Sequence, residues 1–347
     1  QGMKDDADVA EAMAIMGQMG LREPTSMGVS VQLTAEGIDQ KFYVRSPAPR
    51  TGVMKMLDSE NSALMPPRFV PPDVASVYTM SLDFQALWAE ARRIMDEVEP
   101  GTTEMMDQQF AMMKEQMGVD IQADLIGSLG KSFTVYQFEP KPADPDAPFP
   151  MPQQRVVVAI EVTNAAKMSQ VLDIMMQMAA GMMGMPPGDE EYMGVKIKAL
   201  NMGVQEVSMA VAADHLIISM MKDDLKGLIR SLGKEDVKTL VDSEAFRSAM
   251  EGLPRMRSLV SWSDPRLAID MMTTQMQTIG MMMPEISEWL DASLFPAEVM
   301  KKYLDVSGGV MVNEEDGLFM ISRNRMHLPK ATETAPEKPG AVEEAPK

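Results

Sequence analysis

The sequence predicts an α+β fold in which antiparallel sheet segments pack against amphipathic, methionine-rich helices. Apolar and polar residues alternate in several short segments, such as residues 28–33, and this spacing is typical of half-buried strands. In longer segments, such as residues 167–183, apolar residues recur every three or four positions, as an amphipathic helix requires. Short Gly, Asn or Asp turns separate several of the expected strands, which indicates antiparallel pairing.

The first half is expected to begin with a helix and a β-hairpin. Residues 46–72 are rich in Pro and Ser, so we expect a connection that contains one short helix. Asp83 precedes an apolar helical stripe and is expected to cap that helix. In order, the elements are a helix at 8–19, strands at 28–33, 38–45 and 75–80, helices at 84–98, 103–117 and 123–129, and a strand at 132–138.

The second half repeats the alternation of strands and helices after a proline-rich loop at 140–152. Asn164 is expected to cap a methionine-rich helix. The elements expected after the loop are a strand at 155–162, a helix at 167–183, strands at 194–200, 206–212 and 216–220, helices at 223–232 and 243–253, a strand at 258–262, helices at 264–282, 285–290 and 296–303, and strands at 308–312 and 318–323.

Two pairs of similar segments suggest an internal repeat. Residues 28–45 and 309–323 each contain a strand, a turn ending in an acidic residue and glycine, and a second strand closing on arginine. Residues 74–88 and 257–272 each lead from a short strand through an aspartate into an apolar helix. The alternative is that any two hairpins with glycine turns look alike.

The repeat interpretation predicts the domain organisation. Residues 1–66 would be the closing part of a preceding repeat unit, a helix plus β-hairpin that docks onto the next unit. Residues 67–328 would be a complete α+β unit, which could consist of two similar lobes divided near 140–153. Residues 329–347 are rich in Pro, Glu, Ala and Lys, and we expect a disordered tail.

Charge and composition exclude several kinds of function. The 51 acidic and 32 basic residues give a formal net charge of −19, which disfavours nucleic acids and anionic membrane surfaces. With no cysteine and two histidines, thiolate chemistry, Fe–S clusters and Cys-type or His-rich metal sites are excluded. No segment has the apolar length of a membrane-spanning helix. Gln1 opens no signal-peptide pattern, so we expect a processed or truncated start.

Three segments carry a family resemblance: residues 69–77 (FVPPDVASV), 83–88 (DFQALW) and 117–130 (MGVDIQADLIGSLG). Together they resemble a family of large exported bacterial proteins of unknown function, over roughly residues 30–325. These motifs mark the ends of helices and strands and contain no catalytic residues. The resemblance implies an extracytoplasmic location, periplasmic or secreted, and it carries over no catalytic residue.

Familiar catalytic and ligand motifs are incomplete. Gly130-Lys131-Ser132 resembles the end of a phosphate loop, but Leu125 stands where that loop needs glycine, and the expected helix precedes the strand. We therefore expect Gly130 to be a helix C-cap. The acidic segment 313–317 lacks the ligand spacing of a calcium loop, so we expect a hairpin turn with Gly317 at positive φ.

The remaining titratable groups suggest no acid–base pair. Residues 189–191 and the pair Glu97 and Glu99 are expected on solvated surfaces, because catalysis would need one carboxylate in a dry pocket. His215 and His327 lack the flanking pattern of a nucleophile elbow. We expect no enzymatic activity and no cofactor.

The 40 methionines are the unusual feature of the composition. Thioethers three or four residues apart share a helix face and are soft ligands suited to Cu(I), and the candidates for such a site are Met175, Met178, Met182 and Met185. The same spacing is also that of a buried helix face, which is the favoured interpretation. An exposed, Met-lined groove for apolar peptides is an intermediate case.

The leading hypothesis is a non-enzymatic, exported binding or scaffold protein with a protein or peptide partner. A concave, Met-lined apolar surface would support it. The alternative is a soft-metal protein, which requires three or more sulfurs converging on one point. A hydrolytic enzyme is a distant third and requires a buried carboxylate or histidine in a pocket.

The copper hypothesis makes a direct prediction. If sulfur ligands converge, titration of the apo protein with Cu(I) against a competing chelator should give a dissociation constant below micromolar, because several thioethers would bind one ion. Affinity weaker than micromolar would end the copper hypothesis.

Overall fold

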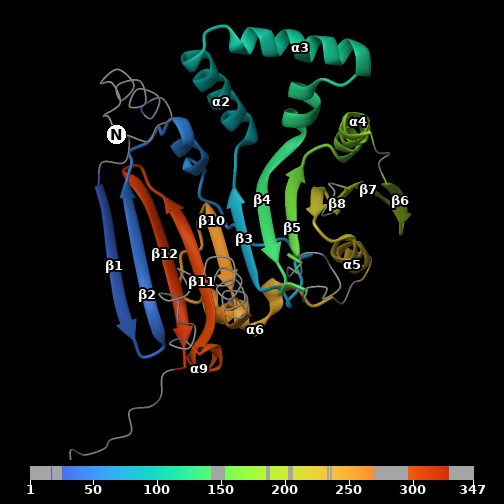
Figure 1. Ribbon diagram of the computed structural model, residues 1–347. Coiled ribbons are helices and arrows are strands. Elements are labelled where there is room, and N and C mark those ends of the chain that lie inside the picture. Colours follow the sequence, from blue (N-terminus) through green and yellow to red (C-terminus); the bar gives the residue numbers. More distant parts are fainter. Residues whose placement is uncertain are drawn as a thin grey trace, which may run out of the picture.

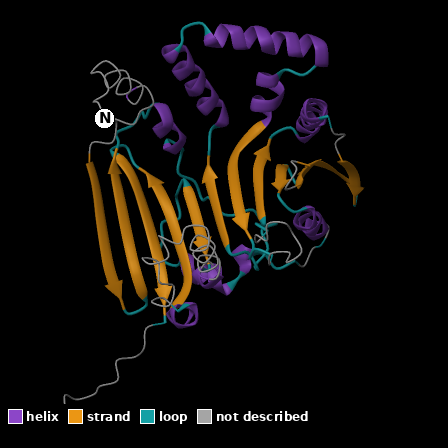
Figure 2. Ribbon diagram, in the orientation of Figure 1, coloured by secondary structure: helices purple, strands orange, loops and turns teal. Residues whose placement is uncertain are grey.

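A computed structural model of the chain contains a twelve-stranded antiparallel sheet, with helices on both faces and beyond one end of its strands (Figures 1 and 2). The predicted combination of helices and antiparallel strands is therefore confirmed. The residues described are 26–141, 153–184, 188–201, 206–232, 237–267 and 296–327, with the single residues 17, 234 and 269.

The strand order brings the first and last hairpins of the described chain together. It runs β1-β2-β12-β11-β10-β3-β4-β5-β9-β8-β7-β6, and β2 pairs with β12 from Gly317↔Arg45 to Arg325↔Gly37. The N-terminal hairpin is thus docked in the common sheet. The strands are β1 Ser26–Thr34, β2 Gly37–Arg45, β3 Ser76–Ser81, β4 Leu129–Gln137, β5 Val156–Val162, β6 Gly188–Tyr192, β7 Val195–Asn201, β8 Glu206–Ala212, β9 His215–Ser219, β10 Leu259–Ser263, β11 Leu304–Asn313 and β12 Gly317–Met326.

The centre of this order is the antiparallel pair β3–β10, in which Thr79 faces Val260. On one side of the pair β11 and β12 follow β10, and on the other β4 and β5 follow β3. The N-terminal hairpin β2–β1 comes next beside β12, and the hairpin β9–β8 comes next beside β5. The first five strands on each side of this boundary therefore follow the same pattern, and β7 and β6 extend one side only.

Helices cover the sheet unevenly (Figure 1). Ala210 of β8 belongs to the main core with Leu225 and Leu228, whereas Met209 and Val211 pack with Leu172 and Met176. Because neighbouring residues of a strand point to opposite faces, α5 and α4 lie on opposite faces of the sheet. The helices are α2 Phe84–Val98, α3 Thr102–Met117, α4 Ala165–Met183, α5 Lys222–Leu232, α6 Glu244–Met250 and α9 Ala297–Tyr303.

The helices α2 and α3 extend beyond the ends of the strands, and α3 lies beyond α2, farthest from the sheet (Figure 1). The Asp83 side chain accepts a hydrogen bond from the Ala86 amide, so the expected cap of α2 is confirmed. Arg92 forms a bidentate pair with Asp107, at 2.6 Å for each bond. Neither helix contains a buried residue, and the rings of Trp88 and Phe110, with centroids 6.1 Å apart, also join α3 to α2.

Gly37 is required where the two terminal hairpins meet. Its φ is +144°, and a Cβ atom there would lie 2.0 Å from the backbone oxygen of Asn324. Glycine alone fits both the backbone conformation and the close approach of β12. Gly28, in contrast, has open space around its Cβ position.

Three local expectations are wrong. Gly130 lies in β4 rather than at a helix end, because Glu161 packs against it and accepts hydrogen bonds from the Lys131 and Ser132 amides. Residues 188–192, where no strand was expected, form the edge strand β6. Gly317 does not have a positive φ. Glycine is needed there because a Cβ atom would lie 2.4 Å from the backbone oxygen of Val44 and would also clash with the Tyr43 side chain.

Several expectations concern residues outside the described part. These are the helix at 8–19, most of the loop at 140–152, nearly all of the helix at 264–282, the helix at 285–290 and the tail at 329–347. The helix expected at 123–129 is a π-helical turn at Ile121–Leu125 followed by a 3-10 turn at Ile126–Ser128. The internal repeat, the division of 67–328 into lobes and the boundary at 66 stay predictions.

The contrast between Gly37 and Gly28 gives a matched test. Gly37→Ala should lower the free energy of unfolding by about 2 kcal/mol or more, because the new methyl group must displace the β12 backbone. Gly28→Ala should change it by less than about 1 kcal/mol. Urea unfolding of both variants would measure the difference, and equal effects would contradict the close approach.

Candidate functional site

The four methionine candidates do not form a defined group. Met175 on α4 is 42% exposed, and Met178 is half-buried. The side chain of Met182 and the whole of Met185 lie outside the described residues. The buried methionines of α4 are instead Met168 and Met176, so the buried face runs beside the candidates. A metal site formed by Met175, Met178, Met182 and Met185 stays a prediction.

Three of the acidic residues considered for catalysis, Asp189, Glu190 and Glu97, are paired with lysines or arginines. Glu190 lies 2.5 Å from the Lys226 ammonium, whose hydrogen bond lowers the pKa of Glu190. Asp189 lies 2.9 Å from Lys198, and Glu97 pairs with Arg93. Such ionised, partly exposed pairs are typical of a solvated surface.

The two histidines lie apart from any nucleophile pair in the described structure. The ring of His215 packs edge-on against Phe69 with centroids 5.0 Å apart, and its Nδ1 lies 2.6 Å from the Ala213 oxygen. His327 Nε2 lies 3.6 Å from an Asp305 oxygen. Within the described ranges, no cluster of three His, Asp or Glu residues could hold a metal ion.

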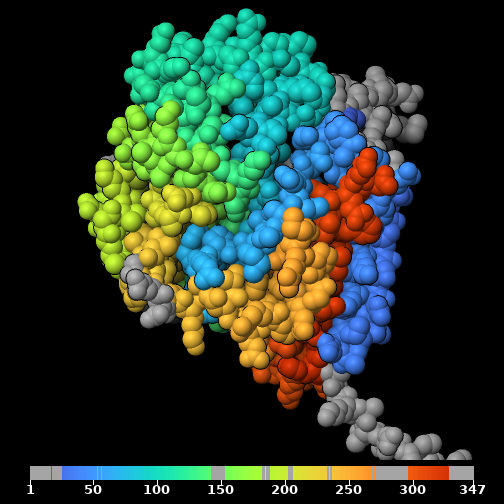
Figure 3. All heavy atoms as spheres, turned by 180° about the vertical axis from the view of Figure 1, so that it is seen from behind, coloured from blue at the N-terminus to red at the C-terminus, as the bar shows by residue number. Residues whose placement is uncertain are grey.

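A cleft of about 990 Å³ lies beside α6, and we call it the α6 cleft. Ligand sites typically have volumes of about 300–1,000 Å³. Figure 3 shows the segment that precedes β3 lying against the segment around α6 and β10. The apolar lining consists of Ala63, Met65, Val241, Phe246, Met250 and Leu253, and the charged lining of Glu244, Arg247, Glu251, Arg255 and Arg257.

Arg257 is the buried charge of the α6 cleft, with only 5% of its surface exposed. Its Nε donates to the Leu64 oxygen at 3.0 Å and its Nη1 to the Pro254 oxygen at 3.1 Å. Nη2 contacts the Met65 sulfur at 2.8 Å. Burial lowers the pKa of Arg257, but a guanidinium remains protonated in proteins. The cleft therefore contains a permanent positive charge.

The other buried arginine among the described residues, Arg50, has a carboxylate partner. It is 2% exposed, and its Nη1 donates to Asp58 at 2.7 Å, so a carboxylate balances its charge. Among the described residues, no carboxylate forms a salt bridge with Arg257. A buried, unbalanced charge is costly, so Arg257 could pair with an anion supplied by a ligand.

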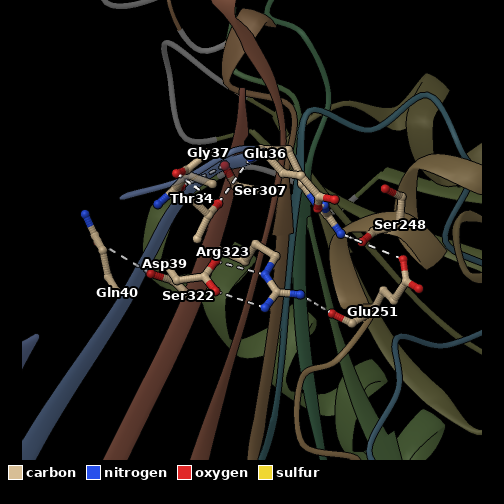
Figure 4. Close-up of polar contacts among 12 residues, drawn as sticks. Thr34, Glu36, Gly37, Asp39, Gln40, Ser248, Glu251, Ser307, Ser322 and Arg323 are labelled. Carbon is tan, nitrogen blue, oxygen red and sulfur yellow. Dashed lines mark hydrogen bonds and ion pairs between the residues drawn. The ribbon is translucent and has the colours of Figure 1, made fainter. Parts of the chain in front are cut away.

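The wall of the α6 cleft is fastened to the terminal hairpins by two arginines of β12 (Figure 4). Arg323 forms a bidentate pair with Asp39 of β2, at 2.9 and 3.0 Å, and donates to the Glu251 oxygen. Arg325 pairs with Glu36 and donates to the Ser248 oxygen at 3.2 Å. Ser248 and Glu251 both line the cleft, so the position of α6 is tied to the β2–β12 pair.

No family model, curated protein or solved structure matches this chain in the comparisons. The described helices include none that is both long and apolar enough to cross a membrane. The function is therefore argued from the site itself.

The α6 cleft was missed by sequence reasoning. Arg257 stands in the sequence as an ordinary charged residue before an apolar strand, and no motif marks it. Its burial results from bridges to Ser62 and Ala63, far away along the chain. A local pattern contains no signal for such a contact.

The Asp39–Arg323 pair predicts a pH dependence of stability. Arg323 lowers the pKa of Asp39 from its ordinary value of 3.8, so the pair stabilises the fold above that value and is lost as the pH falls through the lowered pKa. Asp39→Asn should cost about 1 kcal/mol at pH 7. Urea unfolding should show the gap between variant and wild type closing toward pH 3.

The matched control is Asp107→Asn, which breaks a more exposed pair on α3. It should leave the β2–β12 contact intact, as measured by amide exchange in β2. A gap for Asp39→Asn that stays constant down to low pH would contradict the role of the ion pair.

Proposed function

We propose that this chain is a non-enzymatic, exported binding or scaffold protein whose partner is a protein or peptide. The α6 cleft would hold an apolar segment of that partner, with a carboxylate of the segment against Arg257. The observation that carries the proposal is the buried guanidinium of Arg257 in a cleft that is lined by charged and apolar side chains, Met65 and Met250 among them.

The donors of Arg257 support a carboxylate as the recognised group. A guanidinium has five N–H donors, and among the described residues oxygens accept from Nε and Nη1. Nη2 has the Met65 sulfur as its described neighbour, and a thioether is a weak acceptor. A carboxylate would replace that weak contact with a charge-assisted hydrogen bond.

The apolar lining supports a flexible or extended partner segment. Met65 is 43% exposed and Met250 is half-buried, and methionine side chains adapt to differently shaped apolar groups. The same two sulfurs lie at 2.8 and 4.0 Å from the Arg257 guanidinium. That positive charge disfavours Cu(I) at this point, so the cleft supports peptide binding rather than metal binding.

We also infer an internal repeat, which would make the sheet a scaffold built from two related halves. Asp83 and Asp264 follow β3 and β10, and the spacing between them along the chain equals that between the paired residues Thr79 and Val260. A two-fold axis through the Thr79–Val260 pair would then relate the halves. The matching pattern of the first five strands on each side of that pair supports this inference, whereas β7 and β6 have no counterpart.

The proposal predicts selective binding of free carboxylates. Fluorescent hexapeptides randomised over Leu, Met, Val and Phe should bind about tenfold or more tightly with a free C-terminus than with a C-terminal amide, because the amide cannot form a charge-assisted bond with Arg257. Fluorescence anisotropy would measure both pools.

A substitution within the cleft provides the sharper comparison. Met65→Glu would place a carboxylate beside Arg257 and should abolish the preference for the free acid. Met112→Glu, at a methionine that is 53% exposed on α3, should bind like the wild type. Equal binding of acid and amide pools, or an unaffected Met65→Glu variant, would refute the proposed site.

A further inference from the structure

The strand β1 is an outer strand of the sheet whose apolar side chains lie open. Met27, Val29, Val31 and Leu33 alternate along it and therefore share one face; they are 71%, 70%, 59% and 78% exposed. Among the described strands, β1 has β2 as its neighbour on one side and no neighbour on the other. Every second residue of such an edge turns its N–H and C=O groups outward.

The strand at the opposite edge of the sheet, β6, is protected from pairing with another chain, whereas β1 is not. β6 has five residues, and three of them, Asp189, Glu190 and Glu191, are acidic. A short, charged strand resists pairing with another chain. β1 has nine residues with no charge and no proline. The features that prevent an edge strand from pairing with another chain, short length and charged side chains, are therefore present in β6 and missing from β1.

The sequence of β1 is also complementary to itself in the antiparallel direction. If Ser30 lies on a two-fold axis, Val29 faces Val31 of a second copy and Met27 faces Leu33. On the other face Gly28 faces Gln32, and the end residues Ser26 and Thr34 face each other. Apolar side chains thus meet apolar side chains on one face, and on the other face no polar side chain meets an apolar one. This register pairs all nine residues, and a two-fold contact closes without forming a fibre.

We propose that two copies of this chain pair antiparallel along β1, with Ser30 at the two-fold axis, and join their sheets into one continuous sheet. The interface is separate from the α6 cleft, and it does not depend on the function proposed for that cleft. The contact holds no charged residue of β1, whereas each chain has a net charge of −19. Salt screens that repulsion, so dimerisation strengthens with ionic strength.

The first experiment measures association of the whole chain by sedimentation equilibrium over a range of micromolar concentrations. The wild type is expected to form a monomer–dimer equilibrium that shifts toward dimer at higher salt. Val31→Lys places a charge in the interface and should weaken the dimer about tenfold or more. Met320→Lys, at a residue of the same sheet face that is 47% exposed on β12, should leave the equilibrium unchanged.

The second experiment determines the register and uses the absence of cysteine from the sequence. The proposed pairing puts the two copies of residue 30 within disulfide reach, while the two copies of residue 32 lie about 13 Å apart. With diamide as the oxidant, Ser30→Cys should cross-link about tenfold or more faster than Gln32→Cys. Gly28→Cys mixed with Gln32→Cys should give the mixed dimer, because these positions face each other.

The outcomes separate the possible occupants of the edge. A wild type that stays monomeric at every concentration overturns the proposal and leaves β1 to a strand of a different protein. A dimer that Met320→Lys disrupts and Val31→Lys does not would be packed face to face, which also overturns it. Equal cross-linking of Ser30→Cys and Gln32→Cys would overturn the register.

Discussion

The pairing of β3 with β10 is the contact on which the rest of the fold depends. It is the point where the first half of the sheet meets the second, and its inward residues Val77, Thr79, Val260 and Trp262 are at most 4% exposed. The main core continues from these residues into both halves and reaches α5 and α6. Among the described strands no other pairing joins the two sides of the sheet, so separation of this pair would divide the hydrogen-bonded ladder.

The two buried arginines, Arg50 and Arg257, differ in whether a carboxylate balances their charge. Arg50 is surrounded by Asp58 and the oxygens of Ser46 and Glu314, so it joins the connection after β2 to the turn before β12. Arg257 likewise joins separate segments through the oxygens of Leu64 and Pro254. The difference is the countercharge. A structural role explains Arg50 fully, whereas a role in recognition would also explain why a charge was kept in the α6 cleft.

Local signals predicted much of the secondary structure. The caps Asp83 and Asn164, and the two terminal hairpins, follow from short-range patterns and were found as expected. The strand order could not be obtained in this way, because alternation does not specify which strands pair. Gly130 was misassigned for the same reason, since Glu161 of a neighbouring strand decides its environment. The α6 cleft depends on contacts between Arg257 and residues 62–65, which no local pattern shows.

The pairing of β2 with β12 cannot form until late in translation. Tyr43 and Asp316, which are joined by a hydrogen bond, are 273 residues apart. At about 5–20 residues per second, synthesis takes tens of seconds to cover that distance. Throughout that time the edge of β2 that later pairs with β12 has no partner strand. Nascent chains on neighbouring ribosomes of one mRNA could therefore pair through their β1–β2 hairpins. A chaperone that binds nascent chains would prevent this by binding the hairpin.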